Sequence, residues 1–440
     1  MSKLSPFKQF VQVFQHTITT FPDKRKGKNK HYALVDAAVG AFAVFFTQSP
    51  SFLAYQRDMK ARKGQSNAHT LFGIHEIPSD NQIRALLDPV SPTLVVPVFQ
   101  HGFATLEQRH ELEAFRSWQK RLLVVLDGTQ YFASQKISCP QCSTQHHTNG
   151  TTTYAHRMLT PVIVAPGQNK VIPLPPEFIV PQDGQDKQDC ENAAAKRWLR
   201  QYAQFYRAKG ITVLGDDLYS NHPMCEVLIE EHLPFILVCK PDSHPTLYEQ
   251  LAHRELGKDL HQVMIHRYHT TTGLVIYTYR YTPQLPLRAT ADAVHVNWCE
   301  LTVTTAQGTC LYHNAFVTQE PITKKNVASL VAAGRTRWKV ENENNNTLKT
   351  KGYHLEHNFG HGQQHLAALL ATFNLLAFLL HTLLDLLDAK YRLLRRTLVS
   401  RKTFFDDLRA LTRYMCFASW AHLLDFMLQG LEVALPLDST

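Results

Sequence analysis

The chain has 440 residues, of which 44% are hydrophobic and 19% are charged, with 19 glycines and 22 prolines. This composition excludes a disordered chain, a fibre and a disulfide-stapled miniature, and at roughly 100–200 residues per domain the length allows two to four folded units. Lysine and arginine outnumber aspartate and glutamate by 46 to 37, giving a net charge of +9 that favours a polyanionic partner.

The expected compartment follows from the cysteines and the N-terminus. Most of the eight cysteines stand singly in apolar stretches, and residues 1–20 lack the apolar run of a signal peptide, so we expect a cytoplasmic protein. Segment 365–387 approaches the length of a membrane span, but Asn374, His381 and Asp385 interrupt it. We favour a buried core helix over the membrane alternative and expect no membrane partner.

Residues 1–118 are predicted to be helical, because apolar residues recur at helical spacing and no strand run appears. The predicted helices cover 8–18, 31–47, 52–62 and 79–87. Two basic clusters in this region, at 24–30 and 60–63, indicate either solvated surface or contacts with phosphates.

After residue 121 the pattern changes to short apolar runs typical of buried strands. The sequence predicts one mixed sheet with α/β alternation, followed by a β-rich stretch over 263–318 and then helices from 326 onward. The predicted strands of the sheet are 122–126, 158–164, 171–180, 211–214 and 235–239, and the predicted helices between them are 190–209 and 223–231.

Acidic residues end two of these predicted strands. Asp127 follows the run 122–126 and Asp216 follows 211–214. The carboxyl ends of strands are where α/β sheets build their sites, although aspartates also stabilise turns. Glu341 adds a third acid, four residues after Arg337 on one helix face. Because converging carboxylates repel one another, they favour a hard divalent cation such as Mg²⁺. The alternative ligands are the neighbouring Asp217 and Glu343.

Three motifs surround these acids in order: Leu126-Asp127-Gly128-Thr129, Gly215-Asp216-Asp217-Leu218-Tyr219-Ser220 and Arg337-Trp338-Lys339-Val340-Glu341. Over about residues 120–385, this arrangement resembles the DDE transposases of bacterial insertion sequences, in the superfamily with a YREK signature and a β-rich insertion before the final glutamate. The chain departs from that signature at both ends. Its opening tyrosine falls on Gly334, and its closing lysine falls on Leu348, with Lys349 one place late.

The resemblance implies a ribonuclease-H-like core that cleaves and joins DNA. In such a core Asp127, Asp216 and Glu341 would hold two Mg²⁺ ions, for which Mn²⁺ may substitute. The matching positions of Tyr219 and Arg337, together with Lys349, would contact phosphates near the cut. Trp298, the only tryptophan of the β-rich insertion, is either a stacking platform for a flipped base or a buried strand aromatic.

The resemblance also divides the chain into five parts and predicts its partners. It implies a transposase that binds double-stranded DNA, at transposon ends and target, as a homodimer; the sequence does not assign the dimer interface, and the helices over 393–428 are one candidate. The alternatives are an inactive DNA-binding descendant and a structure-specific nuclease of the same fold. The five parts are a helical DNA-end-binding region (1–118), the first part of the core (119–245), the β-rich insertion (246–322), the helical remainder with the catalytic glutamate (323–388) and a C-terminal helical region (389–440).

A second metal site is suggested by Cys139-Pro140-Gln141-Cys142, because a Cys-x-x-Cys turn can hold zinc. His146 and His147 follow it and are the candidate remaining ligands; the alternative is an exposed, reduced loop. Four further histidines recur every three to four residues, which a metal could use on a helix, but which we interpret as polar surface. They are His354, His357, His361 and His365.

Overall fold

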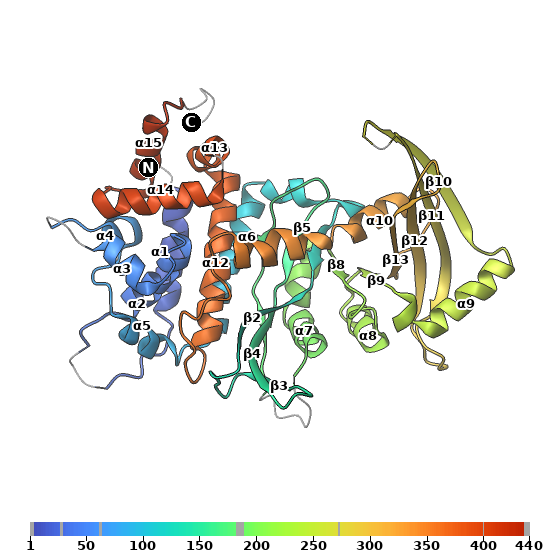
Figure 1. Cartoon of the computed structure of the whole chain (residues 1–440), viewed down its shortest axis with the longest axis horizontal. Helices are drawn as coiled ribbons and strands as arrows, with labels where there is room; N and C mark the ends of the chain where they lie inside the picture. Colours follow the sequence, from blue (N-terminus) through green and yellow to red (C-terminus); the bar gives the residue numbers. More distant parts are fainter. Residues whose placement is uncertain are drawn as a thin grey trace.

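A helical body adjoins a long mixed sheet in the computed structural model of the chain (Figure 1). Of the predicted basic clusters, residues 27–29 and 61–63 lie outside the described residues. In the first cluster Arg25 and Lys30 both pair with Asp23, and this carboxylate offsets part of the positive charge of the cluster. The structure describes residues 4–26, 30–60, 64–181, 189–271, 273–398 and 400–434.

The N-terminal region is helical, as predicted. Serine side chains cap three of its helices: Ser5, Ser51 and Ser66 accept hydrogen bonds from first-turn amides. Small and apolar residues on every side of the second helix leave it buried almost throughout. Two of the helices, α4 and α6 in the list below, were not predicted from the sequence. The helices are α1 (Pro6–Ile18), α2 (Leu34–Phe46), α3 (Phe52–Met59), α4 (Asn67–Phe72), α5 (Asp80–Leu87) and α6 (Val96–Gln108).

The C-terminal helices pack against the N-terminal ones (Figure 1). Asn67 of α4, itself buried, donates to the carbonyls of Thr412 and Met415 at 2.8 and 2.7 Å. Many apolar side chains of these helices are buried against the rest of the chain, among them Leu394, Phe404, Leu408 and Leu424. The helices are α12 (Leu366–Leu387), α13 (Ala389–Thr397), α14 (Arg401–Tyr414) and α15 (Trp420–Gly430).

Helix α12 is long and apolar enough to cross a membrane, but 89% of its apolar window is buried inside the protein. It packs against α1, α2 and α6. The favoured interpretation, a core helix, is therefore confirmed. Burial also explains the polar residues that interrupt it: the amide of Asn374 donates to the carbonyl of Tyr353 at 2.7 Å.

The large sheet has nine strands in the order β10-β11-β12-β13-β9-β8-β1-β5-β6. Strand β8 is parallel to both β1 and β9, and the other pairs are antiparallel. Helix α7 (Glu191–Lys209) precedes β8, and helix α8 (His222–Glu230) connects β8 to β9. The five strands from β6 at one edge of the sheet to β9 are β6 (Ile172–Pro173), β5 (Val162–Val164), β1 (Leu122–Val125), β8 (Ile211–Gly215) and β9 (Phe235–Val238).

The β-rich insertion extends this sheet, because β13 pairs with β9. It begins with a helix, α9 (Pro245–Leu256), so the predicted insertion 246–322 is not entirely β. Figure 1 shows its strands projecting at the end of the molecule opposite the helical body. They are β10 (His261–His269), β11 (Gly273–Pro286), β12 (His295–Thr305) and β13 (Cys310–Thr318).

A smaller sheet is formed mainly by strands that lie between β1 and β5 in the chain. The predicted strand 158–164 is divided between the two sheets at Pro161, and 171–180 is divided by Pro175 and Pro176, because proline cannot donate to a ladder. The small sheet has the order β2-β4-β3, with β7 beside β4. Its strands are β2 (Gly128–Ser134), β3 (Ser143–His146), β4 (Thr152–Leu159) and β7 (Glu177–Ile179).

The segment that carries Glu341 is helical but not a continuous α-helix. Helix α10 (Val327–Arg335) is followed by a π-helical turn, η5 (Val340–Asn345), which continues into α11 (Asn346–Thr350). π-helical turns are rare and often mark functional positions.

Candidate functional site

Asp127 and Asp216 follow the carboxyl ends of two neighbouring inner strands of the large sheet, and we call these strand ends the acidic edge. Strands β1 and β8 are parallel neighbours, and Val125 is paired with Leu214. Asp127 comes two residues after β1, and Asp216 comes directly after β8. Every residue of both strands is buried, so the first charged side chains stand where the strands end.

The carboxylates of this edge share one electrostatic environment. The pKa of Asp127 is raised to about 7, mainly by burial and also by the negative charges of Glu191, Glu341 and Asp216, against the opposing charge of Arg337. Burial also raises the pKa of Asp216, whereas an amide hydrogen bond and the charges of Arg337 and Lys240 lower it. The charges of Asp216 and Glu341 therefore both act on the carboxylate of Asp127.

The π-helical turn holds this edge through an asparagine that the sequence did not single out. The Asn345 amide donates to Asp127 Oδ2 at 2.8 Å, and its oxygen accepts from the hydroxyl of Thr160 at 2.9 Å. On the same segment Arg337 pairs with Glu341 at 2.9 Å. Asn345 lies four residues after Glu341, the spacing that places both residues on one helix face.

Glu191, in the first turn of α7, is a fourth carboxylate that the sequence did not identify. It accepts hydrogen bonds from the Gly128 amide at 2.9 Å and from the Tyr219 hydroxyl at 2.5 Å. A Cβ atom at position 128 would lie 2.1 Å from Glu191 Oε2, so the glycine leaves room for this carboxylate. The only sign of Glu191 in the sequence is that an acidic residue stands at the start of a predicted helix. The helix dipole favours acidic residues at that position in any protein, so the sign does not indicate a site.

Two residues predicted to contact DNA are buried in this structure. Tyr219 is 1% exposed and donates to Glu191, so its hydroxyl faces a carboxylate and not solvent. Trp298 is 0% exposed within β12, which matches the alternative of a core strand aromatic. Arg337 and Lys349 keep some exposure, and Lys349 pairs with Glu356 at 3.0 Å.

The two alternative acids lie differently. Asp217 accepts from the Lys240 amide at 2.6 Å and from the Ser243 hydroxyl, and it lies 3.6 Å from His244 Nδ1. Asp217 therefore fixes the turn after β9. Glu343 is turned toward the hollows beside α11 instead.

The carboxylates offer the oxygen donors that Mg²⁺ prefers, and a cation would relieve their mutual repulsion, which adds to the effect of burial on the pKa of Asp127. They are nevertheless spread over the sheet edge. Among the described residues, the one group of metal-ligating side chains close enough to share a single ion contains cysteine and histidine, not these acids.

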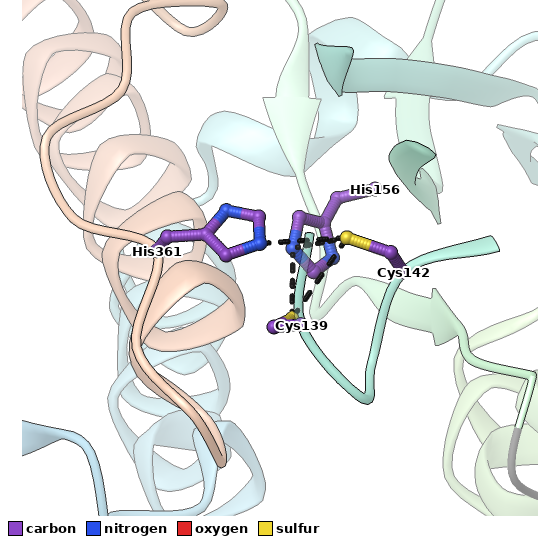
Figure 2. Close-up of side chains that lie close together, drawn as sticks. All are labelled: Cys139, Cys142, His156 and His361. Atoms are coloured by element: carbon purple, nitrogen blue, oxygen red, sulfur yellow. Dashed lines mark hydrogen bonds between the residues drawn. The ribbon is translucent and has the colours of Figure 1, made fainter. Parts of the chain in front are cut away.

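That group includes the predicted Cys-x-x-Cys turn but not the predicted histidines. His146 and His147 are exposed and contact Thr152 and Thr153. In their place, His156 of β4 and His361 lie against Cys139 and Cys142, with all ligand atoms within 4.8 Å of one another (Figure 2). Burial lowers the pKa of His156 to about 4 and raises that of Cys142 to about 11.

The histidine series 354–365 lies in the irregular segment between α11 and α12, not on a helix. Helical spacing therefore does not align these side chains, and of the four only His361 belongs to the cysteine and histidine group.

Two hollows of about 290 and 780 Å³ adjoin the segment that carries Glu341. Both are lined by Glu343, Thr347 and Arg401, so they lie side by side along α11. Basic side chains outnumber acidic ones, Glu343, Asp385 and Asp406, in their walls. The basic residues are Lys170, Lys351, Arg395, Arg396, Arg401, Lys402 and Arg409.

Comparison with known proteins gives no family for this chain: no family model and no curated protein matches it.

Proposed function

We propose that the chain is a transposase of the DDE type, which cleaves DNA at the ends of a mobile element and joins the cut end to target DNA. The observation that carries the proposal is that Asp127 and Asp216 follow the ends of the paired parallel strands β1 and β8, with the charge of Glu341 acting on Asp127. The proposal includes a homodimer, since two DNA ends must be handled together, and a cytoplasmic location, with which eight free cysteines agree.

The strand arrangement supports a ribonuclease-H-like core. Strands β6, β5, β1, β8 and β9 are neighbours in that order, with β5 antiparallel to both of its neighbours and β1, β8 and β9 parallel. This is the arrangement that the family resemblance leads us to expect, with Asp127 at the end of the central strand and Asp216 at the end of the next one.

The side chains of the edge would divide the work of phosphoryl transfer. Mg²⁺ or Mn²⁺, when bound by the acids, activates a water or a DNA 3′-hydroxyl and stabilises the leaving oxygen. Asn345 orients Asp127, and Tyr219 with the Gly128 amide holds Glu191 in place. Arg337, which pairs with Glu341 in the free protein, is positioned to exchange that partner for a DNA phosphate.

The test is Mg²⁺-dependent cleavage of a DNA duplex that carries the repeats flanking the gene. Asp127→Asn, Asp216→Asn and Glu341→Gln keep the side-chain shape while removing the charge. We expect each to lower the cutting rate by more than about 100-fold, which exceeds the effect of losing a partner that merely orients a ligand. Asp292→Asn is the control, because this acid is exposed in the insertion and pairs with Arg288.

Strand joining separates the alternatives. A nuclease of the same fold would cut without joining the 3′-end to target DNA, and a DNA-binding descendant would do neither. If the three variants cut as well as the parent, the proposed ligands are wrong. Asp217→Asn and Glu343→Gln then identify which neighbour replaces them.

A further inference from the structure

The cysteine and histidine group has the geometry of a tetrahedral metal site. The two sulfurs lie 3.8 Å apart, and His156 Nε2 lies 3.6 Å from each of them. The distance from Cys142 Sγ to His361 Nε2 is 3.4 Å. For zinc bonds of about 2.3 Å to sulfur and about 2.0–2.1 Å to nitrogen, tetrahedral angles place two sulfurs about 3.8 Å apart and a sulfur and a nitrogen about 3.6 Å apart.

From this agreement we infer that Cys139, Cys142, His156 and His361 form a structural zinc site. The site goes beyond the proposed DNA chemistry, because none of its ligands belongs to the acidic edge. Two thiolates and two neutral imidazoles balance the charge of Zn²⁺, and four protein ligands leave no open position for a substrate. A tetrahedral S₂N₂ donor set selects zinc over the hard cations that carboxylates bind.

Local contacts prepare the cysteine turn for a metal. The Cys142 amide donates to the carbonyl of Cys139 at 3.1 Å, which closes the turn, and the Gln141 amide approaches Cys139 Sγ at 3.4 Å. An amide that points at a sulfur stabilises the thiolate form that zinc requires. The sulfurs are too far apart for a disulfide, whose bond length is about 2.05 Å.

The ligands come from three separate parts of the chain, which gives the zinc a structural role. Figure 2 shows the two cysteines on one loop, His156 on a strand and His361 on a segment beside the helices, all pointing toward one another. The cysteine loop follows β2, which begins directly after Asp127, and the His361 segment connects α11 to α12. A bound zinc ion would therefore hold the small sheet against the segment between α11 and α12, which follows Glu341 in the chain.

The first measurement is the metal content of the full-length chain, purified without chelators and analysed by inductively coupled plasma mass spectrometry. We expect about one zinc per chain. Co²⁺ exchanged into the site should give the visible bands of a tetrahedral, thiolate-ligated ion. A chain that carries no zinc and also binds none when micromolar zinc is added would overturn the proposal, as would a Cys139–Cys142 disulfide in place of the metal.

Variants then test the ligand set. Cys139→Ser and His361→Ala should lose the zinc, and their unfolding temperature should fall by more than about 5 °C. His147→Ala and Cys190→Ser are matched controls, because both residues are exposed and outside the group. They should keep the zinc. Undiminished zinc in both ligand variants would refute the assignment. If a ligand variant fails to fold, the metal content of the parent chain is the deciding measurement. Because no DNA is involved, the result is independent of the proposed function.

Discussion

Tyr219 connects the two strand ends of the acidic edge to α7. Its ring packs so closely over β8 that a Cβ atom at Gly215 would lie 2.9 Å from it, and its hydroxyl reaches Glu191. Burial raises the pKa of Tyr219 well above its ordinary value, and the charge of Glu191 raises it further. The hydroxyl therefore stays protonated and remains a donor to the carboxylate.

Tyr219→Phe tests this contact, because phenylalanine keeps the ring and removes the donor. A hydrogen bond to a charged group contributes about 1.5–3 kcal/mol, so we expect the free energy of unfolding in urea to fall by that amount. Tyr268→Phe is the control, since Tyr268 is 80% exposed on β10. Equal losses in the two variants would show that the Tyr219 hydroxyl contributes nothing to stability.

His381 of α12 is a buried base inside the helical body. The hydroxyl of Tyr353 is hydrogen-bonded to its Nδ1 at 2.6 Å, and Phe46 and Phe405 pack on its ring. Burial lowers its pKa well below the ordinary 6.5, and the positive charges of Arg401 and Arg395 lower it further. The folded protein therefore holds this imidazole neutral in mildly acidic solution.

Stability should consequently decrease below about pH 6.5. There the unfolded chain binds a proton at this histidine and the folded chain does not, so acid favours unfolding. One pH unit below 6.5 the cost is about 1.4 kcal/mol. His381→Gln keeps an acceptor for Tyr353 without a titrating group. Between pH 7.5 and 5.5 its free energy of unfolding should fall by about 1.4 kcal/mol less than that of the parent; an equal fall would contradict the assignment.

At the scale of elements, α10 explains one departure from the family signature. Gly334 stands where the signature has tyrosine, and a Cβ atom there would lie 2.8 Å from Phe316 of β13 and 2.9 Å from Ile236 of β9. All three residues are buried at the point where the insertion joins the core sheet. The helix approaches the sheet too closely for any side chain at this position.

Gly334→Ala should therefore destabilise the chain, although alanine favours helices. Overpacking a core costs about 1–3 kcal/mol, which exceeds the propensity gain of about 1 kcal/mol. Gly40→Ala in α2 is the matched control, because a Cβ atom there meets nothing within 4 Å. We expect the free energy of unfolding to fall for the first variant and to rise for the second; a rise in both would contradict the close approach.

The sequence predicted those elements whose burial is visible locally. Strands β1 and β8 are continuous apolar runs, and α7 has clear helical periodicity, so Asp127 and Asp216 could be placed at strand ends. The small sheet is largely polar and interrupted by loops, and β2 and β3 were missed. Glu191, Asn345 and His156 were missed, and His361 was interpreted as polar surface, because their partners are distant in the chain and leave no local pattern.

At the scale of the whole molecule, acidic and basic features adjoin the same segment. The charge of Glu341 acts on Asp127 at the end of β1, and among the charged residues that line the hollows along α11, lysine and arginine predominate. Figure 1 shows α13 and α14 at the end of the molecule that is opposite α9. A DNA backbone bound at the acidic edge would continue over these hollows, where its phosphates meet positive charge.

Removing single charges from the hollows should weaken DNA binding in a salt-dependent way. Lys351→Gln and Arg396→Gln each remove one cation that lines a hollow. Each lost phosphate contact lowers the slope of log affinity against log salt by about 0.9, so the variants should bind flanking-repeat DNA less tightly and with a shallower slope between 50 and 200 mM salt, as is typical of counterion release. Lys258→Gln, exposed beyond α9, should leave the slope unchanged. Fluorescence anisotropy titrations measure the slopes, and an equal slope for all three variants would place the DNA elsewhere on the protein.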